Sequence, residues 1–133
     1  MPLFAAPLLA GCAGKRDFLP LGTVNSVNLW IAAHDGSSWG WKITDAEQLS
    51  QIVAFVDLQR ADWRAELFDS PTPTVGIQLF NGEQEQCTFE VGTGFFQTRR
   101  EGKLFYKYAS RTDVQRFFDV MHLDDATLKE YTK

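Results

Sequence analysis

The stretch TVGIQLFNGEQEQCTFEVG, residues 74–92, decides the fold. Apolar side chains recur at every second position on both sides of Asn81-Gly82: Val75, Ile77 and Leu79 before it, and Cys87, Phe89 and Val91 after it. A period of two is typical of a strand with one buried face, and Asn-Gly is a strong hairpin turn. The stretch therefore predicts an antiparallel hairpin with Cys87 on its buried face, since an unpaired cysteine behaves as a small buried hydrophobe.

The pattern continues downstream into two more strands and a helix. After the break at Gly92-Thr93-Gly94, strands are predicted at 95–98 and 104–108, with a turn at Glu101-Gly102 between them. Four consecutive strands of this kind form a meander in the simplest topology. Ser110 can cap a following helix, whose apolar positions have helical spacing: Val114, Phe117, Phe118 and Met121. A last short helix carrying Leu128 is expected to start at Asp124 or Asp125.

Upstream, the sequence predicts a helix preceded by a hairpin. Thr44-Asp45-Ala46-Glu47 matches a capping box with Thr44 as the N-cap, and the helix is expected to end near Arg60. Its apolar stripe has the spacing i, i+3, i+4, i+7: Leu49, Ile52, Val53 and Val56. The segments 27–33 and 39–43 alternate and flank a turn. Pairing Ala33 with Trp39 and Leu29 with Ile43 places their apolar side chains on one face.

The predicted fold class is α+β, with an antiparallel sheet of about six strands in the order ββαββββα and two main helices packed on one face. Residues 23–133 form the single domain, which suits a chain of 133 residues. The two-residue period assigns Trp30, Phe80 and Phe105 to the other face of the sheet, together with Phe95 or Phe96. These aromatic side chains are the candidate binding surface, because large exposed apolar patches rarely lack a role. The alternative is that the N-terminal segment, the 71–73 loop or the last helix covers them.

The N-terminus has the pattern of an export signal. Residues 2–11 are uncharged and apolar, end in small residues, and precede Cys12 and a polar segment. Leu9-Ala10-Gly11-Cys12 resembles the lipobox of bacterial lipoproteins. The resemblance implies a signal segment at 1–11, acylation of Cys12, a tether at 12–22 and a lipid-anchored place in the cell envelope. Ala13, in place of Asp, implies the periplasmic side of the outer membrane in a Gram-negative host. Since no Lys or Arg precedes the apolar run, an apolar extension of a cytosolic protein is the alternative.

Composition and charge narrow the function classes. Hydrophobic residues make up 44% of the chain and charged residues 23%, as in an ordinary globular domain. The formal net charge of −4 argues against nucleic acid as a partner. Basic residues gather between 99 and 116, where they can contact an acidic partner or anionic lipid headgroups, or simply solubilise strand edges and turns. No cofactor or metal motif is found, and Gly92-Thr93-Gly94 matches no phosphate-binding motif.

Two function hypotheses follow. The first is a non-enzymatic envelope lipoprotein whose sheet face binds a partner, with an envelope protein favoured over a small ligand. The second is an enzyme acting on envelope polymers, with a site built from dispersed carboxylates and His34. The first hypothesis is favoured because it rests on the export signal and on the lack of a catalytic constellation. His34 lies in a predicted turn beside Asp35, and His122 lies at a helix end, where a cation is favoured structurally.

Overall fold

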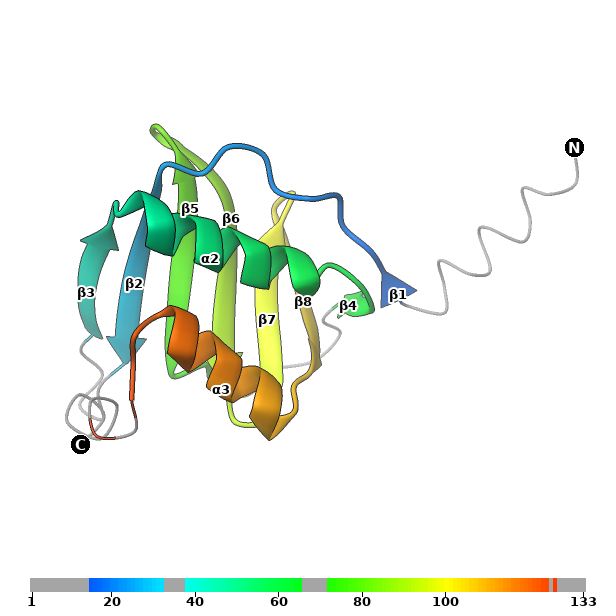
Figure 1. Ribbon diagram of the computed structural model, residues 1–133. Coiled ribbons are helices and arrows are strands. Elements are labelled where there is room, and N and C mark those ends of the chain that lie inside the picture. The colour runs from blue at the N-terminus through cyan, green and yellow to red at the C-terminus, as the bar shows by residue number, and fades with distance from the viewer. Residues whose placement is uncertain (1–14, 33–37, 66–71, 125, 127–133) are drawn as a thin grey trace, which may run out of the picture.

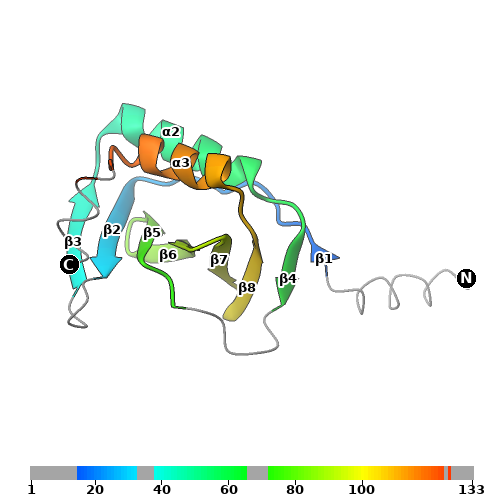
Figure 2. The same cartoon turned by 90° about the horizontal axis from the view of Figure 1, so that it is seen from below.

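An antiparallel sheet with two helices on one face makes up the computed structural model, which describes residues 15–32, 38–65, 72–124 and 126. In chain order the strands are β1 (Lys15–Arg16), β2 (Ser26–Ala32), β3 (Ser38–Ile43), β4 (Trp63–Ala65), β5 (Val75–Asn81), β6 (Gln84–Gly92), β7 (Phe95–Arg100) and β8 (Lys103–Tyr108), and the helices are α2 (Ala46–Leu58) and α3 (Arg111–Val120). Figure 1 shows α2 and α3 lying over the sheet, and Figure 2 shows that both cover the same face. The predicted α+β class is confirmed.

The sheet contains eight described strands in the order β1-β4-β8-β7-β6-β5-β2-β3. The segment from β5 to β8 forms the predicted meander, and the β2–β3 hairpin extends the sheet beyond β5. The predicted count of about six strands was too low because it omitted β1 and β4. These strands have two and three residues, too few to display a period of two in the sequence.

The hairpin of residues 74–92 has the predicted faces. Leu79 pairs with Cys87, Ile77 with Phe89 and Val75 with Val91, and all six side chains are buried. The turn places Gly82 at φ 64°, a conformation that glycine adopts at little cost. The core of the domain therefore begins on this hairpin.

The first hairpin keeps its predicted faces but not its predicted register. Leu29 pairs with Trp41 and Val27 with Ile43, so the predicted pairing of Leu29 with Ile43 was wrong by two residues. A shift of two residues leaves every side chain on the same face, so the apolar pattern cannot distinguish the two registers. The predicted partner Ala33 lies outside the described residues.

Helix α2 begins one residue later than predicted. The Oδ2 atom of Asp45 accepts a hydrogen bond from the backbone N–H of Gln48 at 2.9 Å, so Asp45 is the N-cap in place of Thr44. Both residue types can cap a helix, and the carboxylate also interacts favourably with the positive end of the helix dipole. Leu49, Ile52 and Val56 are buried as predicted, and Phe55 joins them.

Helix α3 begins and ends with defined caps. Ser110 is the N-cap, as predicted, with its Oγ atom accepting from the backbone N–H of Asp113 at 3.1 Å. At the other end the N–H of Leu123 bonds to the carbonyl of Phe118 at 2.8 Å and that of His122 to Asp119 at 3.2 Å. This is a Schellman motif with His122 in the left-handed region at φ 58°. The predicted last helix carrying Leu128 falls largely outside the described residues.

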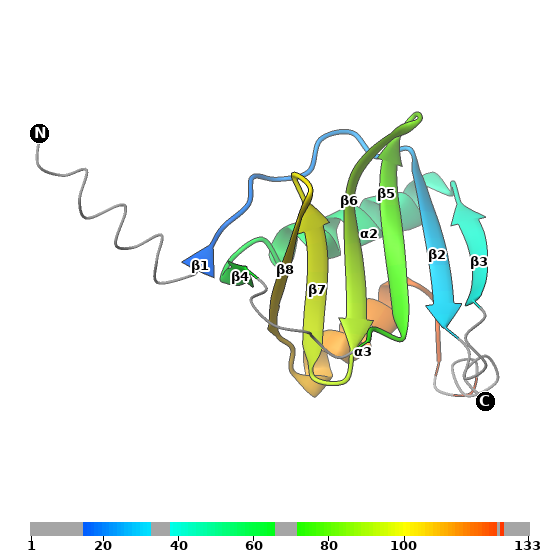
Figure 3. The same cartoon turned by 180° about the vertical axis from the view of Figure 1, so that it is seen from behind.

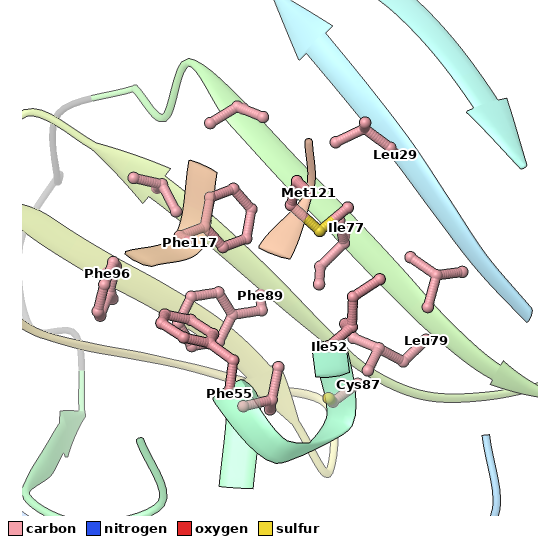
Figure 4. Packing of buried hydrophobic residues seen from close by; sticks show 14 of the residues in the cluster. Leu29, Ile52, Phe55, Ile77, Leu79, Cys87, Phe89, Phe96, Phe117 and Met121 are labelled. Carbon is pink, nitrogen blue, oxygen red and sulfur yellow. The ribbon is translucent and has the colours of Figure 1, made fainter. Parts of the chain in front are cut away.

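The core lies between the helices and the sheet (Figure 4). Phe89 is at its centre, with ring centroids 5.5 Å from Phe55, 6.0 Å from Trp63 and 5.8 Å from Phe117. The Phe55 and Trp63 rings meet Phe89 edge to face, an arrangement that aromatic pairs prefer. Cys87 is buried on the same face, which confirms its predicted position.

The N-terminal segment 15–22, which the sequence led us to expect as part of a tether, lies against the domain. Its residues Lys15 and Arg16 pair with β4 at the edge of the sheet. Phe18 is buried, with its ring 5.1 Å from that of Phe105. The part of the predicted tether that the structure describes is therefore packed on the domain.

Candidate binding face of the sheet

The candidate site lies on the outer face, which we define as the sheet surface opposite α2 and α3. Figure 3 shows this surface with the helices behind it. One row of cross-strand neighbours runs across five strands: Trp30 of β2, Gly76 of β5, Glu90 of β6, Gln97 of β7 and Tyr106 of β8. Cross-strand neighbours point to the same face, and four strand spacings place Trp30 about 19 Å from Tyr106 along the sheet.

The indole of Trp30 lies against the backbone of β5. A Cβ atom on Gly76 would lie 2.5–2.7 Å from Cζ2, Cε2 and Nε1 of Trp30. Only glycine therefore fits beneath the ring, because the side chain of any other residue would overlap the position of the indole. The ring of Phe95 covers Gly92 in the same way at one end of the sheet.

The middle of the row is polar and its β8 end is aromatic. Gln97 donates a hydrogen bond from Nε2 to Oε1 of Glu90 at 3.1 Å and is only 6% exposed. On β8, Tyr106 is 37% exposed and Tyr108, the cross-strand partner of Phe95, is 82% exposed. The two tyrosines thus offer apolar rings and hydroxyl groups on one strand.

The structure separates the three residues that the sequence assigned to this surface. Trp30 lies on the outer face, and so does Phe80, which pairs with Ser26; both are half-buried. Phe105 was assigned wrongly: it is 4% exposed and its ring packs against Phe18 beneath the N-terminal segment. Strand β8 has aromatic residues at both odd-numbered and even-numbered positions, so its sequence does not reveal which face is buried.

Sequence reasoning missed Tyr106 and Tyr108. Lys107, between the two tyrosines, is a misleading residue, because a charged side chain in a strand is ordinarily expected on the solvent side. Instead, the Lys107 ammonium lies 4.9 Å from the Trp63 ring and donates hydrogen bonds to the carbonyls of Gln59 at 3.1 Å and Ala61 at 3.0 Å. Burial lowers the pKa of Lys107, while Asp62 acts in the opposite direction. The amine thus satisfies carbonyls at the end of α2.

In the described part of the chain, the remaining reactive side chains do not converge on the outer face. Burial raises the pKa of the Cys87 thiol to about 11, which keeps it protonated and unreactive at neutral pH. His122 is exposed beyond α3, whereas Cys12 and His34 lie outside the described residues. Within the described ranges, no three Asp, Glu, His or Cys side chains are grouped so that they could hold a metal ion.

Comparison of the chain with protein-family models, with curated proteins and with solved structures gave no match. In the part of the chain that the structure describes, neither helix has the length and apolar character needed to cross a membrane.

Proposed function

We propose that this protein is a small envelope lipoprotein, anchored through Cys12, that binds a protein partner on its outer face without catalysing a reaction. The observation that carries the proposal is the exposure of Tyr106 and Tyr108 on the face that also carries Trp30. Tyrosine and tryptophan are enriched at the centres of protein interfaces, since each supplies a large contact area with few rotatable bonds. The lipobox at 9–12 supports the anchor.

The position of the first strand supports an arrangement close to the membrane. Lys15 of β1 follows Cys12 by three residues, which span about 10 Å at most when extended. The proposed anchor would therefore hold the β1 edge of the sheet near the bilayer. We propose the periplasmic side of the outer membrane as the location in a Gram-negative host, since Ala13 follows the cysteine.

The test uses the full chain purified from envelope membranes, with envelope extract passed over the immobilised protein. We expect the wild type and a Leu58→Ala control to retain the same partner, because Leu58 is 77% exposed but lies on α2. A Tyr106→Ala/Tyr108→Ala variant should retain about tenfold less, as expected when interface aromatic residues are truncated. Circular dichroism of the three proteins checks that each is folded.

The same samples test the anchor by mass spectrometry. The expected chain begins at Cys12 and carries the mass of its lipid. An unmodified chain beginning at Met1 would refute the anchor, and equal retention of the partner by the double variant and the control would refute the binding face.

A further inference from the structure

A cleft of about 290 Å³ opens where the N-terminal segment passes the turn that joins β7 and β8. Figure 1 shows this crossing, and Figure 3 shows it from behind. The cleft is lined by residues 16–22, by Gln86 of β6 and by Arg100 and Glu101 at the end of β7. It lies apart from the outer face, since Arg100 points to the side of the sheet that carries Phe18.

Arg100 is held in this cleft without a carboxylate partner among the described residues. Its guanidinium carbon lies 4.7 Å from the centre of the Phe18 ring. Its side chain lies close enough to Cys87 to act on the pKa of that thiol, but its Nε atom is buried and has no hydrogen-bond partner among the described residues. A buried donor without an acceptor costs free energy, and the cost is larger for a charged group.

The carboxylates around the cleft are already engaged. Glu101 forms an ion pair with Arg16 at 2.6 Å. The Oδ1 atom of Asp17 accepts a hydrogen bond from the backbone N–H of Asp62 at 3.0 Å. The guanidinium of Arg100 is therefore the basic group in the cleft that has no anionic partner within the described ranges.

We propose that Arg100 is the anchor of a binding site for a phosphate group in this cleft. A guanidinium presents several N–H donors in a fixed plane, which suits bidentate contact with phosphate oxygens. The amide of Gln86, which also lines the cleft, can donate a further hydrogen bond. Because two basic and two acidic side chains line the cleft, their formal charges cancel, and we expect millimolar rather than tighter affinity.

The phosphate can come from free phosphate or from a phospholipid headgroup. The headgroup source rests on the proposed anchoring, since Arg16 follows Cys12 by four residues, or about 14 Å of extended chain. Binding of free phosphate does not depend on the anchor or on a protein partner. The two proposals can therefore fail separately.

The first experiment titrates the full chain with inorganic phosphate and follows the backbone amides of residues 16–22 and Gln86 by nuclear magnetic resonance. Sodium chloride at matched ionic strength is the salt control. Arg99→Gln is the control variant, because Arg99 is the neighbouring residue and its side chain is exposed. We expect saturable shifts in the wild type and in this control. Arg100→Gln should bind about tenfold more weakly, as should Arg100→Lys, which keeps the charge but loses the planar donors.

Three results would overturn the proposal: no saturable shift in the wild type up to tens of millimolar phosphate, the same shifts with sodium chloride, or equal binding by Arg100→Gln and Arg99→Gln. Arg100→Lys keeps the test decisive if Arg100→Gln does not fold.

The second experiment identifies the source of the phosphate. Phosphatidylglycerol vesicles are sedimented with each protein, with and without added inorganic phosphate, and every protein carries Cys12→Ser so that a lipid on Cys12 cannot itself bind the vesicles. Retention of the wild type and Arg99→Gln but not of Arg100→Gln, reversed by phosphate, assigns the site to headgroups. Equal sedimentation of all three proteins, together with phosphate binding in solution, assigns it to free phosphate.

Discussion

The thiol of Cys87 is 2% exposed in the core, and its burial raises the pKa from the ordinary value of 9.0 to about 11. The charge of Arg100 acts in the opposite direction but does not cancel the effect of burial. Above its ordinary pKa the unfolded chain releases the thiol proton, whereas the folded chain keeps it. The free energy of unfolding should therefore fall as the pH rises between these two values, by about 2–3 kcal/mol at most.

Denaturant titrations of the wild type and Cys87→Ala, at about pH 8 and about pH 10.5, measure this effect. Other groups also titrate in this range, so the quantity of interest is the difference between the two proteins. The wild type should lose more stability than the variant. An identical loss in both would show that the thiol is as accessible to solvent in the folded state as in the unfolded chain.

At the scale of the strands, Trp30 of β2 packs directly over Gly76 of β5. A Gly76→Ala substitution would place a methyl group 2.5–2.7 Å from three indole atoms, so the ring must leave its position. We expect a loss of about 1–3 kcal/mol in the free energy of unfolding, as for other overpacked sites. The indole N–H resonance of Trp30 should shift strongly.

Gly22→Ala is the matched control, because an added Cβ atom there meets no atom of the described residues within 4 Å. Its stability should stay close to that of the wild type. If Gly76→Ala were as stable as Gly22→Ala, the indole would not rest on β5 as the structure shows. Denaturant unfolding of both variants gives the comparison.

The strands also show how much of the fold could be predicted from the sequence. Strands β5 and β6 were recognised because each has enough alternating residues to reveal a period, and β7 and β8 were recognised by the turn residues that bound them. The face of Leu29 was predicted correctly but its partner was not, since a shift of two residues preserves the pattern. In the candidate site, Trp30 was placed correctly because the two-residue period of its strand assigns it to the outer face. Tyr106 was missed because β8 carries aromatic side chains on both faces and Lys107 points inward.

Over the whole molecule, the N-terminal segment is part of the fold from residue 15 onward. The backbone N–H of Phe18 bonds to the carbonyl of Arg60 at 2.9 Å, and that of Leu21 bonds to Oδ1 of Asp57 at 2.9 Å. These bonds connect the segment to the end of α2 and to the loop before β4. A lipid on Cys12 would thus be attached to the domain through a very short linker.

Phe18 is the side chain on which this attachment depends, because it is buried between the rings of Trp63 and Phe105. Phe18→Ala should lower the free energy of unfolding by about 3 kcal/mol, the cost of removing a buried phenyl ring. Leu19→Ala is the control, since Leu19 is 83% exposed and its loss should change stability by less than about 0.5 kcal/mol. Both are measured by denaturant unfolding of the full chain. If the two variants were equally stable, the segment would be a loose tether, and the proposed lipid on Cys12 would leave the domain free to turn. A large difference would mean that a lipid on Cys12, as we propose, would hold the β1 edge near the bilayer, with the Arg100 cleft beside Phe18 within reach of its headgroups.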